Sequence, residues 1–302
     1  MRVNTHMQTH KESFLEFVNS INLPTMDPDE MGGIDVFFPS KNVGVTFITL
    51  NEHSELQGGK ARNFHKRLTD EYSKLGWHIL QIYETEWINN PHIIKDKINH
   101  VLRNKPIEKK IYARECEVTE ISSKDKNDFL FSVHRQGLDR SSIKYGLYHE
   151  GKLVAVMTFG KPRIALGRKT SKGNIQENHY ELLRYGVSDV IIGGASKLLS
   201  RFIKDHNPSE ILTFADRRYS TEENFYTKIG FKLESTTLPN YWYFKVGETD
   251  LLHRFNFRKD QLPKKLAIFD VSLSEWTNMK VNGYDRIWDS GNYKYVWKPN
   301  KK

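Results

Sequence analysis

Apolar and polar residues alternate along the first third of the chain with spacings typical of both helices and strands. Proline and glycine pairs such as Gly32-Gly33 separate the apolar segments, and Pro106 begins a charged linker. The expected order is helix, strand, strand, helix, strand, helix, which describes a compact α/β unit. The pattern predicts helices at 10–20, 61–75 and 91–102, and strands at 34–38, 43–50 and 78–83.

The remainder of the chain shows the same two spacings, with strands more frequent than helices. A polar loop rich in Lys and Gly is expected at 161–177. Two hairpins are predicted. One joins strands 145–149 and 152–159 at Glu150-Gly151, and the other joins strands 284–288 and 293–297 through a turn at 289–292. The other strands are expected at 180–187, 211–215, 232–235 and 241–245, and the helices at 193–204, 223–229 and 273–279.

These elements divide the chain into three predicted parts. Residues 1–105 form an α/β domain, residues 111–247 form a second α/β domain with a mostly antiparallel sheet, and residues 248–302 form a basic extension with a helix and a hairpin. A chain of 302 residues is long enough for two domains of ordinary size.

Composition narrows the class of partner. Lys and Arg total 46 against 37 Asp and Glu, which gives a net charge of +9 and favours a polyanion such as double-stranded DNA over a neutral partner. A basic surface that only aids solubility is the alternative.

No apolar run reaches the ~20 residues of a membrane span, and the single Cys116 excludes internal disulfides. We therefore expect a cytoplasmic protein without a membrane partner.

One acid and two histidines in the first domain could carry chemistry. Asp35 opens a strand, and His53 and His65 follow it on the next elements. A carboxylate can hold Mg²⁺, and imidazole can move a proton near neutral pH. A glutamate of the first helix, Glu12 or Glu16, could orient water. Taken singly, Asp35 could equally be a turn residue, and the histidines could be surface polar groups.

Residues 34–88 resemble the catalytic segment of the very short patch repair (Vsr-like) endonucleases and their phage homing-endonuclease relatives. The resemblance rests on the spacing of Asp35 to Pro39, on His53, on His65 relative to Gly76-Trp77, and on the run GWHILQIYETEW. It implies a PD-(D/E)XK fold in which Asp35 binds Mg²⁺ or Mn²⁺. His53, His65 and Glu12 would be the other catalytic residues. Thr46 departs from the pattern, because the phage enzymes place a glutamate there.

The second domain resembles the core of a GNAT acyltransferase. The resemblance rests on ELLRYGV, VIIGGASKLLSRFI, ILTFADRRYS and NFYTKIGF in that order. In this family a glycine-rich turn at a helix N-terminus holds a pyrophosphate. Gly193 and Gly194 occupy the turn, but Val190 supplies no basic side chain ahead of it. A tight turn that only packs a helix on the sheet is the alternative, so no cofactor-binding residue is assigned.

Basic and aromatic residues of the second half are candidates for nucleic-acid contact. The run ADRRYS to TTLPNYWYF is similar to phage Mom-like DNA-modification proteins and to the C-terminal half of phage homing-type endonucleases. Such residues can contact phosphates or stack on bases. The candidate phosphate contacts are Arg217, Arg218, Arg254, Arg258, Lys259, Lys264 and Lys265.

Three functions compete on this evidence. The leading hypothesis is a Mg²⁺-dependent double-stranded DNA endonuclease of the phage homing type. The second is a GNAT-like or Mom-like transferase that modifies a base or an amine. The third is an inert DNA-binding protein, in which Thr46 marks the loss of cleavage. The sequence does not indicate an oligomeric state.

Overall fold

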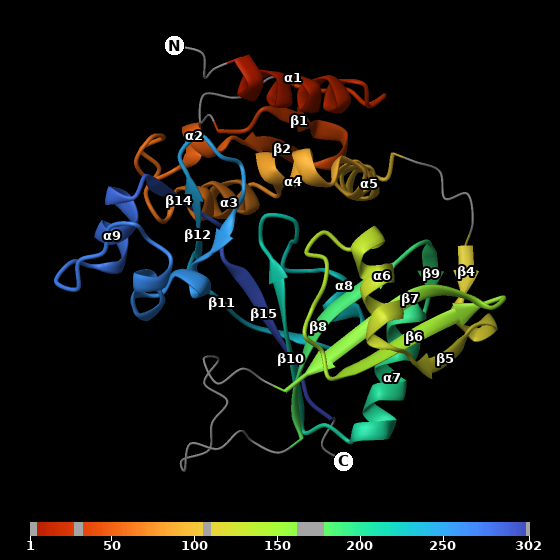
Figure 1. Ribbon diagram of the computed structural model, residues 1–302. Coiled ribbons are helices and arrows are strands. Elements are labelled where there is room, and N and C mark those ends of the chain that lie inside the picture. Colours follow the sequence, from red (N-terminus) through yellow and green to blue (C-terminus); the bar gives the residue numbers. More distant parts are fainter. Residues whose placement is uncertain (1–4, 27–32, 105–109, 162–177, 300–302) are drawn as a thin grey trace. The chain divides into compact units, whose positions relative to one another are not determined.

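The computed structural model describes residues 5–26, 33–104, 110–161 and 178–299 (Figure 1). The predicted loop at 161–177 lies almost wholly outside these ranges. The chain is a mixed α/β protein that divides into two compact units. Unit 1 comprises Met1–Asn104, Asp216–Ser220 and Thr237–Asn292, and unit 2 comprises Lys105–Ala215, Thr221–Thr236 and Tyr293–Lys302.

This division differs from the three consecutive parts expected from the sequence. The chain leaves unit 1 at Asn104, close to the predicted linker, but it returns twice. Residues 237–292 group with the N-terminal residues, so most of the segment expected to form a separate extension belongs to unit 1. The apolar cluster of Ile48, Tyr83 and Phe244 joins these distant segments.

Unit 1 contains two three-stranded sheets, with strand orders β1-β2-β3 and β13-β12-β14. In the first sheet β1 is antiparallel to β2, and β2 is parallel to β3. Helix α5 follows Asn90, with Pro91 at its start and Ile94 and Ile98 buried on one face. The elements of unit 1 are α1 (Thr5–Asn19), β1 (Val36–Phe38), η1 (Pro39–Lys41), β2 (Val43–Ile48), α2 (Leu50–His53), α3 (Phe64–Lys74), β3 (His78–Tyr83), α4 (Glu84–Asn89), α5 (Pro91–Leu102), β12 (Tyr241–Lys245), β13 (Leu252–His253), η4 (Arg254–Phe257), η5 (Lys259–Lys264), α9 (Glu275–Val281) and β14 (Tyr284–Trp288).

Unit 2 is built on a seven-stranded sheet of order β11-β15-β10-β8-β7-β6-β5. Strands β5 to β8 form an antiparallel meander, whereas β8 and β10 are parallel. The elements of unit 2 are β4 (Lys110–Tyr112), η2 (Ala113–Glu115), β5 (Glu117–Glu120), α6 (Ser123–Val133), β6 (Ile143–His149), β7 (Lys152–Gly160), β8 (His179–Val187), β9 (Val190–Ile192), α7 (Gly194–His206), β10 (Glu210–Asp216), α8 (Phe225–Lys228), β11 (Lys232–Thr236) and β15 (Asn292–Trp297).

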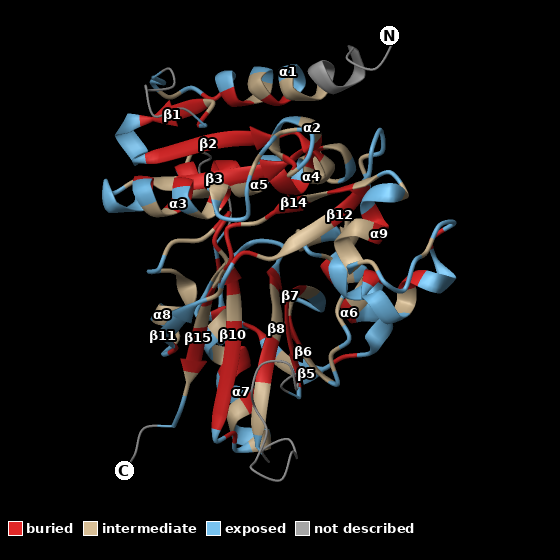
Figure 2. Ribbon diagram, turned by 90° about the vertical axis from the view of Figure 1, so that its left-hand side faces the viewer, coloured by how far each residue is buried: buried red, intermediate tan, exposed pale blue. Residues whose placement is uncertain are grey.

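Helices cover both faces of the unit 2 sheet. Leu198 and Phe202 of α7 pack in the main cluster with Phe159 and Leu182, and Phe159 stacks on Phe202 at 3.6 Å between ring centroids. On the other face Leu130 of α6 packs against the sheet. Strands β7 and β10 are accordingly buried along most of their length, whereas β8 between them is mostly half-buried (Figure 2).

The predicted hairpin at 284–297 is wrong. Both strands form, but β14 pairs with β12 in unit 1, whereas β15 pairs with β11 in unit 2. At the turn between them Gly291 has φ +77°, and a Cβ there would lie 2.4 Å from the carbonyl oxygen of Thr237. Glycine is therefore required where the chain crosses from one sheet to the other. No helix in the described ranges is long and apolar enough to cross a bilayer.

Candidate functional site

The predicted histidines of unit 1 lie together. His53 ends α2 and His65 lies in the first turn of α3, and Nδ1 of His53 is 3.0 Å from Nε2 of His65. The other ring nitrogen of His65, Nδ1, is 2.7 Å from the carbonyl oxygen of Trp288. A carbonyl only accepts, so Nδ1 of His65 carries hydrogen and Nε2 accepts from His53.

Both histidines are held in the neutral form. Burial, and then the charges of Lys60 and Lys11, lower the pKa of His53 from its ordinary 6.5 to about 4. Burial, and then the neighbouring His53, lower the pKa of His65 to about 3. A proton on either ring would be a charge with little access to water. Near neutral pH the pair therefore forms an uncharged hydrogen-bonded chain.

Asp35 binds donors of its own unit. Its Oδ1 pairs with Nζ of Lys11 at 3.0 Å, and its Oδ2 accepts from the backbone N of Phe47 at 2.6 Å and from Oγ1 of Thr46 at 3.2 Å. Thr46 thus serves as a donor to Asp35, where the nuclease pattern expects a second acid. Glu12 is exposed on α1 and makes no hydrogen bond or ion pair with a described residue.

The predicted phosphate contacts of unit 1 fall into two groups. Arg217 and Arg218 are buried, at 4% and 5% exposure. Arg217 donates to Asp70 at 2.5 Å, whereas Arg218 binds Glu86 at 3.0 Å and Asp216 at 2.9 Å. These two guanidinium groups stabilise unit 1 and are not presented to a ligand. The exposed group comprises Arg254, Arg258, Lys259, Lys264 and Lys265.

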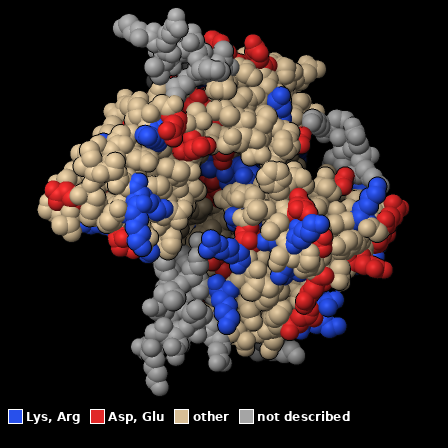
Figure 3. Space-filling model, in the orientation of Figure 1, with Lys and Arg blue, Asp and Glu red and all other residues tan. Residues whose placement is uncertain are grey.

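The basic side chains do not form one uniform face. In Figure 3 lysines and arginines are interspersed with acidic side chains over much of the surface drawn. Within the exposed group Arg258 lies over the ring of Phe255 at 4.2 Å, and Phe255 is 59% exposed. An exposed cation stacked on an exposed ring is held by a cation–π interaction.

Strand β8 of unit 2 contains a bulge. Its pairing with β7 runs from Thr158↔Arg184 to Phe159↔Leu182, so Leu183 is an extra residue on β8. A bulge bends its strand and increases the local twist. The parallel pairing of β8 with β10 ends at the neighbouring Glu181, although β8 continues to Val187. The two strands diverge beyond that point, and we call this the strand gap.

Two hydroxyl groups lie at the strand gap. Oγ1 of Thr213 on β10 donates to the carbonyl oxygen of Leu182 at 3.0 Å, replacing a ladder hydrogen bond. Tyr226 on α8 lies near Thr213. Burial raises the pKa of Tyr226, while Thr213 and the charge of Arg184 act in the opposite direction. A proton donor is therefore present beside the diverging strands.

The glycine turn lies between β9 and α7. Gly193 has φ +78°, and a Cβ on Gly194 would lie 2.8 Å from Ile191, so both positions favour glycine. Helix α7 has thirteen residues, and its first backbone N–H groups have no partner within the helix. Lys197 donates to the carbonyl oxygens of Ala113 at 2.8 Å and Cys116 at 2.5 Å, so its ammonium stabilises packing.

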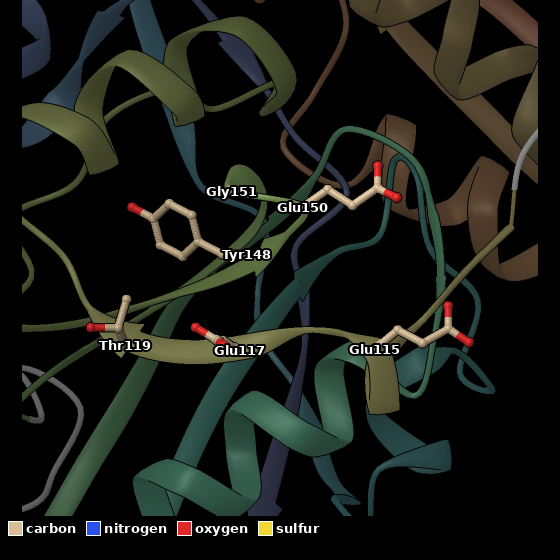
Figure 4. A pocket seen from close by; sticks show the side chains of 6 residues that line it. All are labelled: Glu115, Glu117, Thr119, Tyr148, Glu150 and Gly151. Carbon is tan, nitrogen blue, oxygen red and sulfur yellow. The ribbon is translucent and has the colours of Figure 1, made fainter.

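A surface pocket occurs at the edge of the same sheet. Glu117 and Thr119 on β5, Tyr148 on β6, and Glu115, Glu150 and Gly151 line it (Figure 4). Its acidic side chains belong to exposed turns and to an edge strand. Solvated carboxylates of this kind do not define a ligand, so the strand gap is the stronger candidate.

Sequence reasoning missed several residues of both sites. Lys11 was not identified as the partner of Asp35, because a helix pattern does not predict which acid a lysine will bind. Arg184 had a signal, since it is a charged residue within an apolar strand pattern. Tyr226 had a stronger one, because it lies in the run NFYTKIGF that carries the resemblance to a GNAT core, although no role was predicted for it.

No model of a known protein family matches the chain, and no curated protein matches it. The similar solved structures include a GNAT family acetyltransferase from Elizabethkingia anophelis with acetyl-CoA bound, at 11% identity and a TM-score of 0.33, covering 61% of this chain and 99% of that one. They also include an IAA acetyltransferase from Bacillus cereus, at 13% identity and a TM-score of 0.31, covering 61% and 99%. A third is the ribosomal-protein-S18-alanine N-acetyltransferase from Escherichia coli, at 9% identity and a TM-score of 0.33, covering 62% and 96%.

The prediction of a Mg²⁺-dependent endonuclease is wrong. The described residues contain no group of three or more His, Cys, Asp or Glu side chains that could hold a metal ion. Both oxygens of Asp35 bind donors of unit 1, as described above. The three solved structures named above are acetyltransferases, and none of them is a nuclease. Neither Mg²⁺ nor Mn²⁺ is retained as a cofactor.

Proposed function

We propose that unit 2 transfers an acyl group from a coenzyme A thioester to an amine. The observation that carries the proposal is the coincidence of the bulge at Leu183 with the end of β8–β10 pairing. Diverging parallel strands expose backbone groups and a slot between neighbouring strands, which suits an extended, mostly neutral chain such as pantetheine. The helix N-terminus after Gly193 suits the diphosphate at the other end.

The residues at the strand gap suit the chemistry of acyl transfer. When bound, the thioester supplies a carbonyl carbon that gains a C–N bond to the amine and loses its C–S bond to the departing thiolate. The hydroxyl of Tyr226 donates a proton to that sulfur. The amine releases one proton to solvent, from which Tyr226 recovers its own. The ring of Tyr226 is held in place by its packing against Phe231 and Tyr295.

A charge placed at the first turn of α7 tests the proposal. Ser196 is exposed at the third position of the helix, so Ser196→Glu should fold well because an acid there is favourable to the helix. Its carboxylate should repel a diphosphate and weaken acetyl-CoA binding about tenfold, as expected for like charges a few ångströms apart. Ser196→Gln is the matched neutral control.

Calorimetric titration with acetyl-CoA measures the effect. The proposal expects binding by the wild type and Ser196→Gln, and weaker binding by Ser196→Glu. If the wild type binds no acetyl-CoA, or if Ser196→Glu binds it as well as the wild type does, unit 2 does not hold the thioester in this way.

A second proposal concerns the partner, which we infer to be double-stranded DNA bound through unit 1. The five exposed basic residues between Arg254 and Lys265 support it, since they lie within twelve positions of the chain. On this view the amine acceptor would be a group on the DNA or on a protein bound to it. Fluorescence anisotropy with a labelled duplex at several salt concentrations tests the partner independently of the acyl donor.

A further inference from the structure

Arg184 occupies an unusual position beside the strand gap. It follows the bulge residue Leu183 on β8 and pairs across the ladder with Thr158 on β7. Its side chain is half-buried, and Nη1 donates to the carbonyl oxygen of Leu183 at 2.8 Å. The guanidinium therefore turns back along its own strand, to the place where β8 and β10 separate.

The charge of Arg184 has no counterion in the described part of unit 2. No acidic side chain there forms an ion pair with it, and its Nε is shielded from water without a hydrogen-bond partner. Burial lowers the pKa of Arg184, with Asp139 acting in the opposite direction. A shielded guanidinium remains charged, so an unpaired donor here is unfavourable unless a ligand supplies an anion.

Asp139 and, more weakly, Glu181 are the acids that act on Arg184, and neither forms an ion pair with it. Other groups occupy the oxygens of Asp139. Its Oδ1 accepts from Nζ of Lys126 and from the backbone N of Ser141, both at 2.9 Å. Its Oδ2 accepts from Oγ1 of Thr158 at 2.5 Å. Although burial raises the pKa of Asp139, these hydrogen bonds hold it below its ordinary value. Asp139 is thus already neutralised by Lys126 and leaves Arg184 available.

We propose that Arg184 binds a carboxylate carried by one of the two substrates, an inference that rests on acyl transfer by unit 2. Nε is enclosed and one hydrogen of Nη1 goes to Leu183, so Nη2 and the second hydrogen of Nη1 are the donors left for the two oxygens of a carboxylate. The charges of Arg184 and Tyr226 influence each other, so the anion would lie close to the proton donor. The carboxylate belongs either to a dicarboxylic acyl chain on the thioester or to the amine acceptor.

The first arm of the test uses the donor. Calorimetric titrations compare succinyl-CoA with acetyl-CoA on the wild type, Arg184→Gln and the control Arg201→Gln, which removes an exposed arginine of α7. If the donor carries the carboxylate, the wild type and Arg201→Gln bind succinyl-CoA at least about tenfold more tightly than acetyl-CoA, as a charge-assisted hydrogen bond provides. Arg184→Gln loses that preference and keeps its affinity for acetyl-CoA.

The second arm uses the acceptor side. Glutarate and its uncharged diamide, glutaramide, are titrated against the same three proteins, with and without saturating coenzyme A. Glutarate binding that needs Arg184 assigns the carboxylate to the acceptor and supports the inference. If neither arm shows a carboxylate preference dependent on Arg184, the inference is overturned, while binding of acetyl-CoA would still uphold acyl transfer. If no thioester binds, the proposed function fails, and the titrations without coenzyme A still decide whether Arg184 binds a carboxylate.

Discussion

The buried arginines of the two units have different partners. In unit 1, Arg217 and Arg218 are fully enclosed, and their guanidinium groups bind Asp70, Glu86 and Asp216. In unit 2, Arg184 is half-buried beside diverging strands, and its single hydrogen bond among the described residues is to its neighbour's carbonyl. A charge that is neutralised within the fold contributes to stability, whereas a shielded charge without a counterion indicates a ligand.

The titratable groups of the two units differ in the same way. His53, His65 and Asp35 use their polar atoms on one another or on groups of unit 1. Tyr226 lies near Thr213, at a point where the pairing of β8 with β10 has ended. The cluster that looked most like an active site in the sequence is thus largely self-satisfied. Tyr226 and Arg184 are less conspicuous in the sequence. They lie beside the strand gap, where hydrogen-bond donors remain that no described group of the fold accepts.

Replacing Arg218 should have the largest effect. The change Arg218→Met leaves the half-buried Glu86 and Asp216 without their buried cation and removes the stacking on Tyr83, 3.8 Å from the ring centroid. Removing one partner of a buried ion pair typically costs about 3–5 kcal/mol. Urea unfolding should report this loss, and Arg114→Met, at an exposed arginine, should change stability little. If Arg218→Met instead weakened DNA binding and left stability unchanged, Arg218 would be a phosphate contact, as the sequence predicted.

The next largest effect concerns Tyr226. The change Tyr226→Phe removes the proton donor at the strand gap but keeps the ring that packs against Phe231 and Tyr295. The rate of acyl transfer should fall about 100-fold, the contribution typical of a general acid, with acetyl-CoA affinity unchanged. Thiol release from acetyl-CoA in the presence of a panel of amines measures the rate. Tyr148→Phe, on β6, is the control, and an equal loss there would remove the special role of Tyr226.

The sequence predicts local structure well where the pattern is local. The strand predicted at 78–83 has the same bounds as β3. The prediction succeeds because Gly76 and the acids of α4 mark both ends of one apolar run. It does not predict partners. Strands 284–288 and 293–297 look like a hairpin, yet they enter different sheets. Periodicity states which face of a strand is buried and leaves open which strand lies beside it.

The candidate sites were predictable to a lesser degree for the same reason. Resemblance brought His53 and His65 together, and the structure brings them within hydrogen-bond distance. No spacing could reveal that Lys11 would pair with Asp35, or that Arg217 and Arg218 would bind carboxylates and not phosphates. Charge patterns give the sign of a side chain, whereas its role depends on which group the fold places opposite it.

The histidine pair predicts a pH dependence that belongs to unit 1. Because the pKa of His65 in the folded protein, about 3, lies below its ordinary 6.5, the unfolded chain binds a proton more readily. Stability should therefore be complete above pH 6.5 and should fall as the pH drops toward 3. Between pH 6.5 and 4 this loss should amount to about 3 kcal/mol, and it should be absent in His65→Gln.

Urea unfolding at pH 7, 5 and 4 measures this dependence, and the exposed His92→Gln serves as control. An identical slope in the wild type and His65→Gln would mean that His65 is accessible to protons in the folded state. The histidine pair would then exchange protons with solvent in the folded protein. Unit 1 would no longer differ from the strand gap in how far its titratable groups are enclosed.

The smallest effect tests the exposed basic residues against the buried ones. The double change Lys264→Gln with Lys265→Gln should leave stability unchanged, because both side chains are exposed. If each lysine neutralises a phosphate, the slope of log affinity against log salt should become shallower by about 2. Lys124→Gln with Lys152→Gln removes the same charge from exposed positions of unit 2 and should leave the slope as it is. Equal changes in both double variants would mean that net charge alone drives DNA binding, and the segment from Arg254 to Lys265 would lose its assigned role.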